Sequence, residues 1–398
     1  MKTIAIDHLP IEKNPIYSND FNSAYIYSNI MLPLFKHNGK AVRKNACKNF
    51  KIIGNKYIIE IYDNIKYNNG QQVNINDYYT TFKNILNKKC YAKYLLENVK
   101  KIYVKKNRLI FILKHKDKFF LEKLTFFAFS PYNNGLTCGP YCISKKDHQF
   151  ILLSKNKYSF FNTNNNSYHL KFIYYKNDVQ AFFEGKVDRT NITTFPVEQI
   201  HNMKPNIFDS NMFFVVKFSP KLMNNRYRKF RKFISNNINK EEINKSLKKT
   251  YTIKNDFLMN NNCKLSVKKT RKKSGKLLNN ESKLILGYTD FYPNGKIANI
   301  LKEQLENLDL NISNKIYKLC KATNYDLYID IIYSPFFSEE SLYLSKYFKI
   351  VNGKLYRILC GLYESTKIKI FFEIIKFICS YNSNIIPLFK NKYIYLER

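Results

Sequence analysis

The strongest constraint on the fold is an alternation of strand and helix patterns late in the chain. Residues 283–288 form a short apolar run, 296–308 carry apolar residues at helical spacing, and 325–333 again have a strand pattern. Apolar residues three and four positions apart lie on one helix face, whereas a short apolar run is typical of a buried strand. This order favours parallel strands joined by a right-handed crossover, and hence an α/β fold.

Earlier segments add strands and helices of the same kind. Residues 50–62 alternate apolar and polar on each side of Gly54-Asn55, which predicts a hairpin with Tyr57, Ile59 and Ile61 on one face. Asn76 and Asp77 predict the start of a helix. Further strands are predicted at 65–67, 109–113, 170–175 and 213–218, and further helices at 177–184, 228–238 and 368–378. At 398 residues the chain is long enough for two or three domains.

The chain is strongly basic, with 67 Lys and Arg against 30 Asp and Glu and a formal charge of +37. Such an excess favours nonspecific attraction to nucleic acid or to anionic membranes. The lysines are scattered over nearly every segment, and Asn, Ile, Tyr and Phe are also abundant, as expected from an AT-rich coding sequence. We therefore expect dispersed charge and no specific nucleic-acid site. The densest basic run, 268–276, and the Asn-rich stretch 162–167 are both expected to be surface loops.

Cysteine and leader patterns give few positive signals. Cys138 and Cys142 are the only close pair among the eight cysteines. Their spacing would suit a metal site or a redox-active thiol pair, but buried free thiols are the better interpretation. The sequence contains no run of about 18 apolar residues, so no membrane span is predicted. Residues 1–7 lack an apolar leader, so we expect a cytoplasmic protein from the sequence as it stands, or a membrane-associated extracytoplasmic one if export follows another route.

Several landmarks occur together in a recognisable order. The first block is a hairpin strand at 57–62, an apolar-Lys-aromatic segment at 65–67, Gly70, and an Asp-aromatic helix start at 77–82. It is followed by Gly139-Pro140-Tyr141, 183–188, 228–243, Tyr325-Asp326-Leu327 and Ile386-Pro387-Leu388. This series resembles family 5 of the extracellular solute-binding proteins, the substrate-binding components of peptide- and nickel-type ABC transporters, over essentially the whole chain. The chain departs from the family pattern in having Asn239-Lys240 where Asp-Arg is usual, a shortened 247–283 span, and no lipid-anchor cysteine.

The resemblance implies a two-lobed periplasmic-binding-protein-like α/β fold with an extra subdomain and a hinge between the lobes. On this basis the first lobe is expected to comprise 1–44, 144–218 and 385–398, the subdomain 45–143, and the second lobe 219–384. The implied function is binding of an oligopeptide or similar small solute in an interlobe cleft for an ABC transporter, with permease subunits as partners. No cofactor, metal or catalytic residue is implied, so the chain is not expected to be an enzyme.

The resemblance places two segments at the ligand. The first consists of Asn19, Asp20 and Phe21. The second is 332–336, which follows the Tyr-Asp-Leu strand and contributes Ile332, Tyr333, Ser334 and Phe336; Asp330 in the strand itself is a further candidate. In oligopeptide binders of the family this second segment carries an Asp that pairs with the peptide amino group, but Pro335 stands there in this chain. Asp330 or Asp20 are the acids that could replace it.

Two other classes of function remain open at the level of sequence. One is an intracellular ligand sensor or a peptide-maturation accessory on the same fold, which the missing leader would suit. The other is a nonspecific nucleic-acid binder, suggested by the charge, although no compact basic-aromatic motif is present. An enzyme has the least support, because no Gly-x-Ser-x-Gly, Walker or His-Glu-x-x-His pattern occurs.

Overall fold

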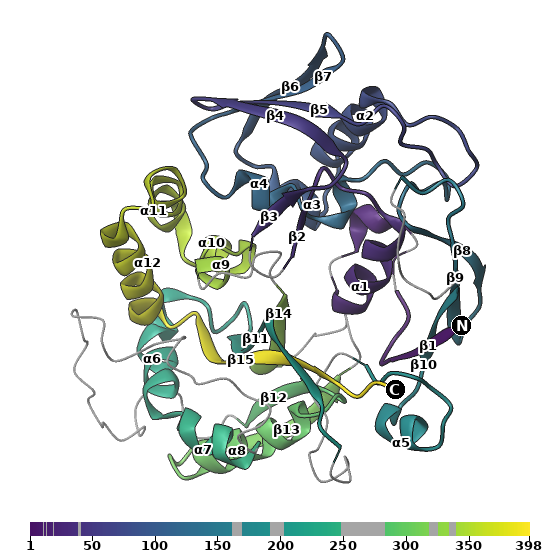
Figure 1. The fold of residues 1–398 in the computed structure, drawn as a ribbon. Coiled ribbons are helices and arrows are strands. Elements are labelled where there is room, and N and C mark those ends of the chain that lie inside the picture. Colours follow the sequence, from purple (N-terminus) through teal and green to yellow (C-terminus); the bar gives the residue numbers. More distant parts are fainter. Residues whose placement is uncertain are drawn as a thin grey trace. The chain divides into compact units, whose positions relative to one another are not determined.

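The computed structural model describes residues 1–398 apart from 11, 13, 19, 39–40, 161–168, 192–202, 248–282, 318–324 and 334–339. The predicted loops at 162–167 and 268–276 therefore lie outside the described residues. Contacts divide the chain into two compact units, which Figure 1 draws as a ribbon. The first unit comprises Met1–Ile192, Glu364–Thr366 and Tyr395–Arg398, and the second Thr193–Tyr363 and Lys367–Ile394. Both contain sheets and helices, which confirms the α/β class.

One sheet of the first unit begins with the N-terminal strand. Its order is β1 (Lys2–Ile6), β10 (His169–Tyr174), β9 (Phe150–Lys155) and β8 (Tyr141–Lys146). The pair β1–β10 is parallel and the other two pairs are antiparallel. Helix α1 (Phe21–Ile30) follows β1, after the short helix η1 (Pro15–Tyr17). Helix α5 (Asp178–Phe183) follows β10, and Asn177, the first residue of the helix predicted at 177–184, is its N-cap.

A second sheet of the first unit contains the predicted hairpin. Its order is β4 (Cys47–Ile53), β5 (Lys56–Ile61), β7 (Arg108–Leu113) and β6 (Val99–Lys105), all antiparallel. Tyr57, Ile59 and Ile61 are buried on one face, as predicted. The strand predicted at 65–67 forms only an isolated bridge between Lys66 and Gln72. The first unit also contains a two-stranded sheet of β2 (Phe35–His37) and β3 (Val42–Lys44). Its remaining short helices are α3 (Tyr91–Leu95), α4 (Phe120–Lys123) and η2 (Phe127–Phe129).

Helix α2 (Ile75–Leu86) shows why the chain turns helical where the sequence predicted it. The N-cap is Asn74, two residues before the predicted start at Asn76, and its side chain accepts from the backbone N–H of Asn76 at 2.8 Å. The carboxylate of Asp77 in turn accepts from the backbone N–H of Asn74 at 2.7 Å, completing a capping box. These two bonds satisfy backbone donors that the first helical turn leaves without partners.

The second unit is built on one five-stranded sheet. Its order is β13 (Ile312–Tyr317), β12 (Leu284–Thr289), β14 (Leu327–Tyr333), β11 (Asn206–Phe218) and β15 (Ile385–Tyr395). β12 runs parallel to both β13 and β14, and α8 (Asn294–Glu306) connects β12 to β13 along the chain. The parallel α/β arrangement that the late sequence pattern predicted is therefore confirmed.

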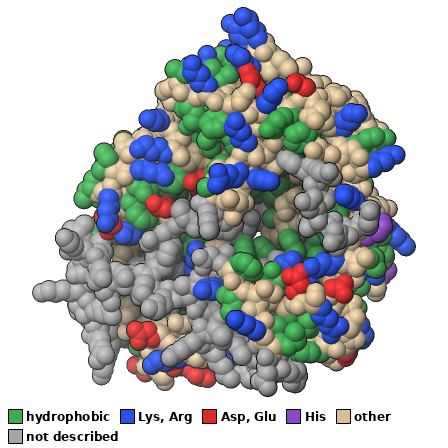
Figure 2. All heavy atoms as spheres, in the orientation of Figure 1, with side chains coloured by type: hydrophobic (Ala, Val, Ile, Leu, Met, Phe, Trp, Pro, Cys, Tyr) green, Lys and Arg blue, Asp and Glu red, His purple; other side chains and the backbone are tan. Residues whose placement is uncertain are grey.

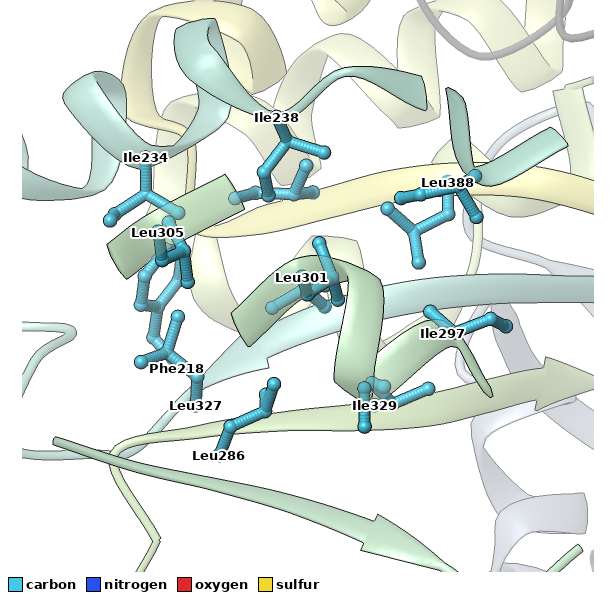
Figure 3. Packing of buried hydrophobic residues seen from close by; sticks show 14 of the residues in the cluster. Phe218, Ile234, Ile238, Leu286, Ile297, Leu301, Leu305, Leu327, Ile329 and Leu388 are labelled. Atoms are coloured by element: carbon cyan, nitrogen blue, oxygen red, sulfur yellow. The ribbon is translucent and has the colours of Figure 1, made fainter. Parts of the chain in front are cut away.

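Helices α6 (Arg228–Asn237), α7 (Lys240–Ser246) and α8 pack on this sheet, and Figure 3 shows part of the contact. Ile297, Leu301 and Leu305 of α8 are at most 1% exposed. They meet buried residues of β12, β14 and β15, among them Leu286, Ile329 and Leu388. Burying one such side chain contributes about 1.5–3 kcal/mol, so this cluster stabilises the packing of the helices on the sheet. Asn239 caps α7 by accepting from the backbone N–H of Glu242.

The strand pairing differs from the expected lobe division at two strands. Residues 206–218 and 385–394 were expected in the first lobe, yet β11 and β15 are neighbours in the sheet of the second unit. Phe213, Phe214, Val215 and Val216 are all buried, so both faces of β11 are covered. A strand that is buried on both faces is typical of the interior of a sheet. The strands that pair with β11 are distant in sequence, so local sequence patterns do not identify them. The lobe boundaries and the hinge stay predictions.

Four helices precede the last strand: α9 (Glu340–Tyr343), α10 (Lys346–Val351), α11 (Gly353–Thr366) and α12 (Lys369–Asn382). The rings of Tyr363 and Phe372 stack with centroids 5.1 Å apart and so join α11 to α12. Among the described residues, none of the helices has the length and apolar character needed to cross a bilayer. Lys and Arg side chains are spread over the face shown in Figure 2.

Candidate ligand-binding segments

Asp20, of the first predicted segment, is placed by the start of α1. Its carboxylate accepts from the backbone N–H of Ser23 at 2.8 Å and from the hydroxyl of Ser23 at 2.5 Å. This is an N-cap, in which a side-chain oxygen satisfies a free donor of the first helical turn. Asp20 therefore has a structural role in addition to any contact with a ligand.

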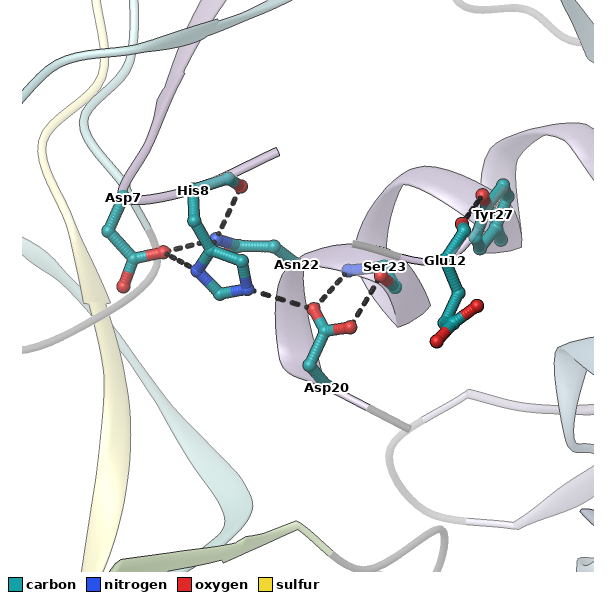
Figure 4. Close-up of polar contacts among 7 residues, drawn as sticks. All are labelled: Asp7, His8, Glu12, Asp20, Asn22, Ser23 and Tyr27. Carbon is teal, nitrogen blue, oxygen red and sulfur yellow. Dashed lines mark hydrogen bonds and ion pairs between the residues drawn. The ribbon is translucent and has the colours of Figure 1, made fainter. Parts of the chain in front are cut away.

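His8 is held between two carboxylates just after β1 (Figure 4). Its Nδ1 lies 2.8 Å from Oδ1 of Asp7, and its Nε2 lies 3.1 Å from Oδ1 of Asp20. Asn22, which is buried, donates to Asp7 and, at 3.0 Å, to the carbonyl oxygen of His8. Burial alone would lower the pKa of His8, but the hydrogen bonds and charges of Asp20 and Asp7 outweigh it and raise the pKa to about 9. His8 is thus an imidazolium at neutral pH, and it also helps to keep the pKa of Asp20 low.

This arrangement predicts a pH-dependent contribution to stability. Because folding raises the pKa of His8 from 6.5 to about 9, the contribution is complete below pH 6.5 and is lost as the pH rises through about 9. We expect wild type to exceed His8→Gln in free energy of unfolding by about 3 kcal/mol below pH 6.5 and by close to zero well above pH 9. Urea unfolding at a series of pH values measures this difference, and the same change at the exposed His148 is the matched control. A difference independent of pH would contradict the imidazolium assignment.

Phe21 begins α1 beside Asp20. Its ring stacks on Tyr25 with centroids 6.3 Å apart, and the rings of Tyr25 and Phe172 are nearly perpendicular with centroids 5.3 Å apart. The guanidinium carbon of Arg189 lies 5.5 Å from the centroid of the Tyr25 ring. The aromatic side chain of the first segment is thereby fixed on the first unit. Asn19 lies outside the described residues.

Asp330, the candidate acid just before the second predicted segment, lies on β14 and forms an ion pair with Lys217 of the neighbouring strand β11. The Lys217 side chain is 8% exposed and that of Asp330 35%, so the cation is the more buried partner. Lys217 Nζ also lies 3.8 Å from the ring centroid of Tyr347. A buried ammonium requires such partners, because desolvation without them is costly. The charge of Asp330 is therefore already compensated within the protein.

The remaining residues of the second segment divide between core and undescribed positions. The Ile332 side chain is buried at 1% exposure and Phe213 is its antiparallel neighbour on β11. Tyr333 ends β14, and only its backbone is described. Ser334, Pro335 and Phe336 lie outside the described residues. Asp20 and Phe21 belong to the first unit and Asp330, Ile332 and Tyr333 to the second, so a ligand site made of both segments stays a prediction.

Two partners of the predicted acids were missed in the sequence. Lys217 stands in the apolar run 213–218, and a lone charge in a buried strand signals a nearby counter-charge. His8 follows Asp7 at the end of the first strand, but a lone histidine gives no indication of its second carboxylate. Neither residue belongs to a motif that spacing alone could reveal.

Cys138 and Cys142 are free thiols, and no disulfide joins them. Cys138 is buried beside Ser130, and burial raises the pKa of its thiol to about 12. A thiol that stays protonated at neutral pH is neither a good nucleophile nor a ready metal ligand. Within the described ranges no group of His, Cys, Asp and Glu is arranged to hold a metal ion. Cys263 and Cys320 lie outside those ranges.

Comparison with known structures supports the fold over its whole length. A periplasmic oligopeptide-binding protein from Borrelia burgdorferi matches with a TM-score of 0.85 at 15% identity, covering 100% of this chain and 95% of that one. AppA from Bacillus subtilis, solved with a nonapeptide, matches with a TM-score of 0.82 at 16% identity, covering 100% of this chain and 94% of AppA. NikA from Staphylococcus aureus, solved with Ni(L-His)2, matches with a TM-score of 0.82 at 17% identity, covering 100% of this chain and 94% of NikA. No curated protein sequence matches the chain.

The sequence itself carries the family pattern. The model for the bacterial extracellular solute-binding proteins, family 5, matches residues 53–349, which is most of the chain. This match confirms the resemblance derived from the motifs. Because the family is one of solute-binding proteins, it also supports the expectation that the chain is not an enzyme. The chain therefore belongs to family 5 of the bacterial extracellular solute-binding proteins.

Proposed function

We propose that this protein binds an oligopeptide or a similar small solute and presents it to an ABC importer. The family match over 53–349 carries the proposal, because it assigns the chain to a solute-binding family. The fold is that of oligopeptide binders, and one such relative, AppA, was solved with a nonapeptide. A peptide bound mainly through its backbone needs several hydrogen bonds, each contributing about 1 kcal/mol net, together with apolar burial to reach a micromolar dissociation constant.

The acids near the predicted segments argue against capture of a peptide amino group. Asp20 is the cap of α1 and already pairs with His8 at 3.1 Å. Asp330 pairs with Lys217. An incoming ammonium would have to displace an internal cation from either carboxylate, and that displacement would leave a buried charge without its partner. The family resemblance implies that Pro335 takes the place of the acid of the oligopeptide binders, and proline offers no carboxylate. We infer that the ligand is held without recognition of its amino terminus.

A comparison of free and amino-acetylated versions of each peptide tests this inference. We expect the two dissociation constants to agree within about threefold, because Asp20 and Asp330 already hold internal cations. Isothermal titration calorimetry against a defined peptide set measures both, with Asp330→Asn and Asp20→Asn as variants. A preference of more than about tenfold for the free amine, lost in one of these variants, would show that this acid captures the amine.

Tyr333→Ala tests whether the second segment contacts the ligand. We expect about 2 kcal/mol of lost binding free energy, since truncating an aromatic at a binding site removes apolar contact. Tyr328→Ala, on the same strand, is the matched control. If the protein bound Ni(L-His)2 but none of the peptides, the solute would be a metal complex and not a peptide. Absence of binding by every peptide and by Ni(L-His)2 would count against the function as proposed.

A further inference from the structure

Helix α11 exposes an apolar stripe as well as burying one. Tyr356, Leu359, Cys360 and Tyr363 face the interior, at no more than 8% exposure. Leu355 and Ile358, by contrast, are 64% and 51% exposed, and Leu362, four residues further, is 41% exposed. Positions three and four apart lie on one side of a helix, so these three side chains form a continuous exposed stripe. Ile350 just before the helix and Ile368 and Ile370 just after it are exposed too.

Basic residues accompany this stripe, and both acids of the same region already have a lysine partner. Residues 346–376 contain seven Lys and Arg but only two acids, Glu364 and Glu373. Glu364 is buried and accepts from Lys123 at 3.0 Å, while Glu373 pairs with Lys376 at 2.7 Å. Lys354 and Arg357 on α11 and Lys369 on α12 are exposed. In Figure 2, hydrophobic and basic side chains are mixed in the region where Figure 1 places α11 and α12.

We propose that the α11 face, defined by Leu355, Ile358, Lys354 and Arg357, docks on an anionic lipid bilayer. An interfacial helix inserts branched apolar side chains between headgroups while its Lys and Arg residues contact lipid phosphates. The α11 face presents both kinds of side chain on one element, which the dispersed lysines elsewhere do not explain. This inference does not rest on the proposed solute.

Charge favours a bilayer over the other occupants of an apolar helix face. A second copy of this chain would bring Lys354 and Arg357 against the same cations, and each chain carries a formal charge of +37. Nucleic acid would satisfy the cations but would leave the Leu and Ile side chains in water. An anionic bilayer surface complements the charge and accepts the apolar side chains.

Vesicle co-sedimentation of the full chain tests the proposal. The probe is phosphatidylcholine vesicles with about one-third phosphatidylglycerol, with pure phosphatidylcholine as reference. We expect binding to the anionic vesicles and a loss of at least about tenfold in partition coefficient for Leu355→Gln/Ile358→Gln. In Lys354→Gln/Arg357→Gln the partition coefficient should fall about fivefold for each charge removed. The reason is that each basic residue near an anionic surface contributes about 1 kcal/mol to binding. All four side chains are exposed, so thermal melting should confirm that the variants fold.

Matched variants separate this face from the general charge. Ile52→Gln/Ile53→Gln removes two exposed isoleucines of β4, and Lys100→Gln/Lys105→Gln removes two exposed cations of β6. Both controls should bind anionic vesicles like wild type. Equal losses in the controls and in the α11 variants would overturn the proposal, as would wild type failing to bind anionic vesicles. Self-association of wild type that Leu355→Gln/Ile358→Gln abolishes, without vesicle binding, would assign the face to a second copy instead.

Discussion

Replacing Lys123 by methionine should lower the free energy of unfolding by about 3–5 kcal/mol, the largest effect that we expect from a single charge. The ammonium of Lys123 lies 2.7 Å from Oδ2 of Asp117 and 3.0 Å from Oε1 of Glu364. All three side chains are buried, at 8%, 0% and 5% exposure. Removal of the cation leaves two buried carboxylates without a counter-charge. Urea unfolding at neutral pH measures the loss.

Removing all three charges together should cost less than removing the lysine alone. In Lys123→Met/Asp117→Asn/Glu364→Gln no uncompensated charge remains, and the side-chain oxygen of residue 117 can still accept from the backbone N–H of Phe119, as Asp117 does at 2.9 Å. The exposed pair Arg108–Glu60 is the matched control, and Arg108→Met should cost less than about 1 kcal/mol. A loss below about 1 kcal/mol for Lys123→Met would mean that the carboxylates find water or take up protons instead.

The parts of the fold that the sequence predicted are those with a local cause. The hairpin at Gly54 follows from alternation around a residue with φ of 60°, and the parallel β12–β14 pair follows from the strand–helix–strand order. The position of β15 beside β11 has no local cause. This position depends on which strands, distant in sequence, pair to complete the sheet. The periodicity of apolar residues does not identify strand partners.

The candidate site shows the same limit at the level of side chains. The motif order located Asp20 and Asp330, but not the cations that compensate them. His8 reaches Asp20 because β1 ends beside the start of α1, and Lys217 reaches Asp330 because β11 and β14 pair antiparallel. Both contacts follow from chain folding and not from spacing in the sequence. The sequence therefore predicted where acids stand but not whether their charge is available to a ligand.

Gly139→Ala should lower the free energy of unfolding by about 3 kcal/mol, through a clash that neighbouring atoms cannot relieve. A Cβ at this position would lie 2.4 Å from the carbonyl carbon of Ile30 and 2.6 Å from its oxygen. These are backbone atoms at the end of α1, and the N–H of Gly139 donates to the same carbonyl oxygen at 2.9 Å. Asn156 holds the other side by donating to the Gly139 carbonyl at 2.9 Å. The glycine of the Gly-Pro-Tyr motif is thus required by a close approach of two backbones.

Gly54→Ala is the matched control for this prediction, because it separates steric crowding from backbone conformation. Gly54 has a φ of 60° but no atom within 4 Å of an added Cβ, so its substitution should cost only the left-handed penalty of about 1 kcal/mol. Urea unfolding of both variants gives the comparison. If Gly139→Ala cost no more than Gly54→Ala, the end of α1 would have moved away from the Gly-Pro-Tyr segment. The motif would then mark a turn rather than the contact that joins α1 to β8.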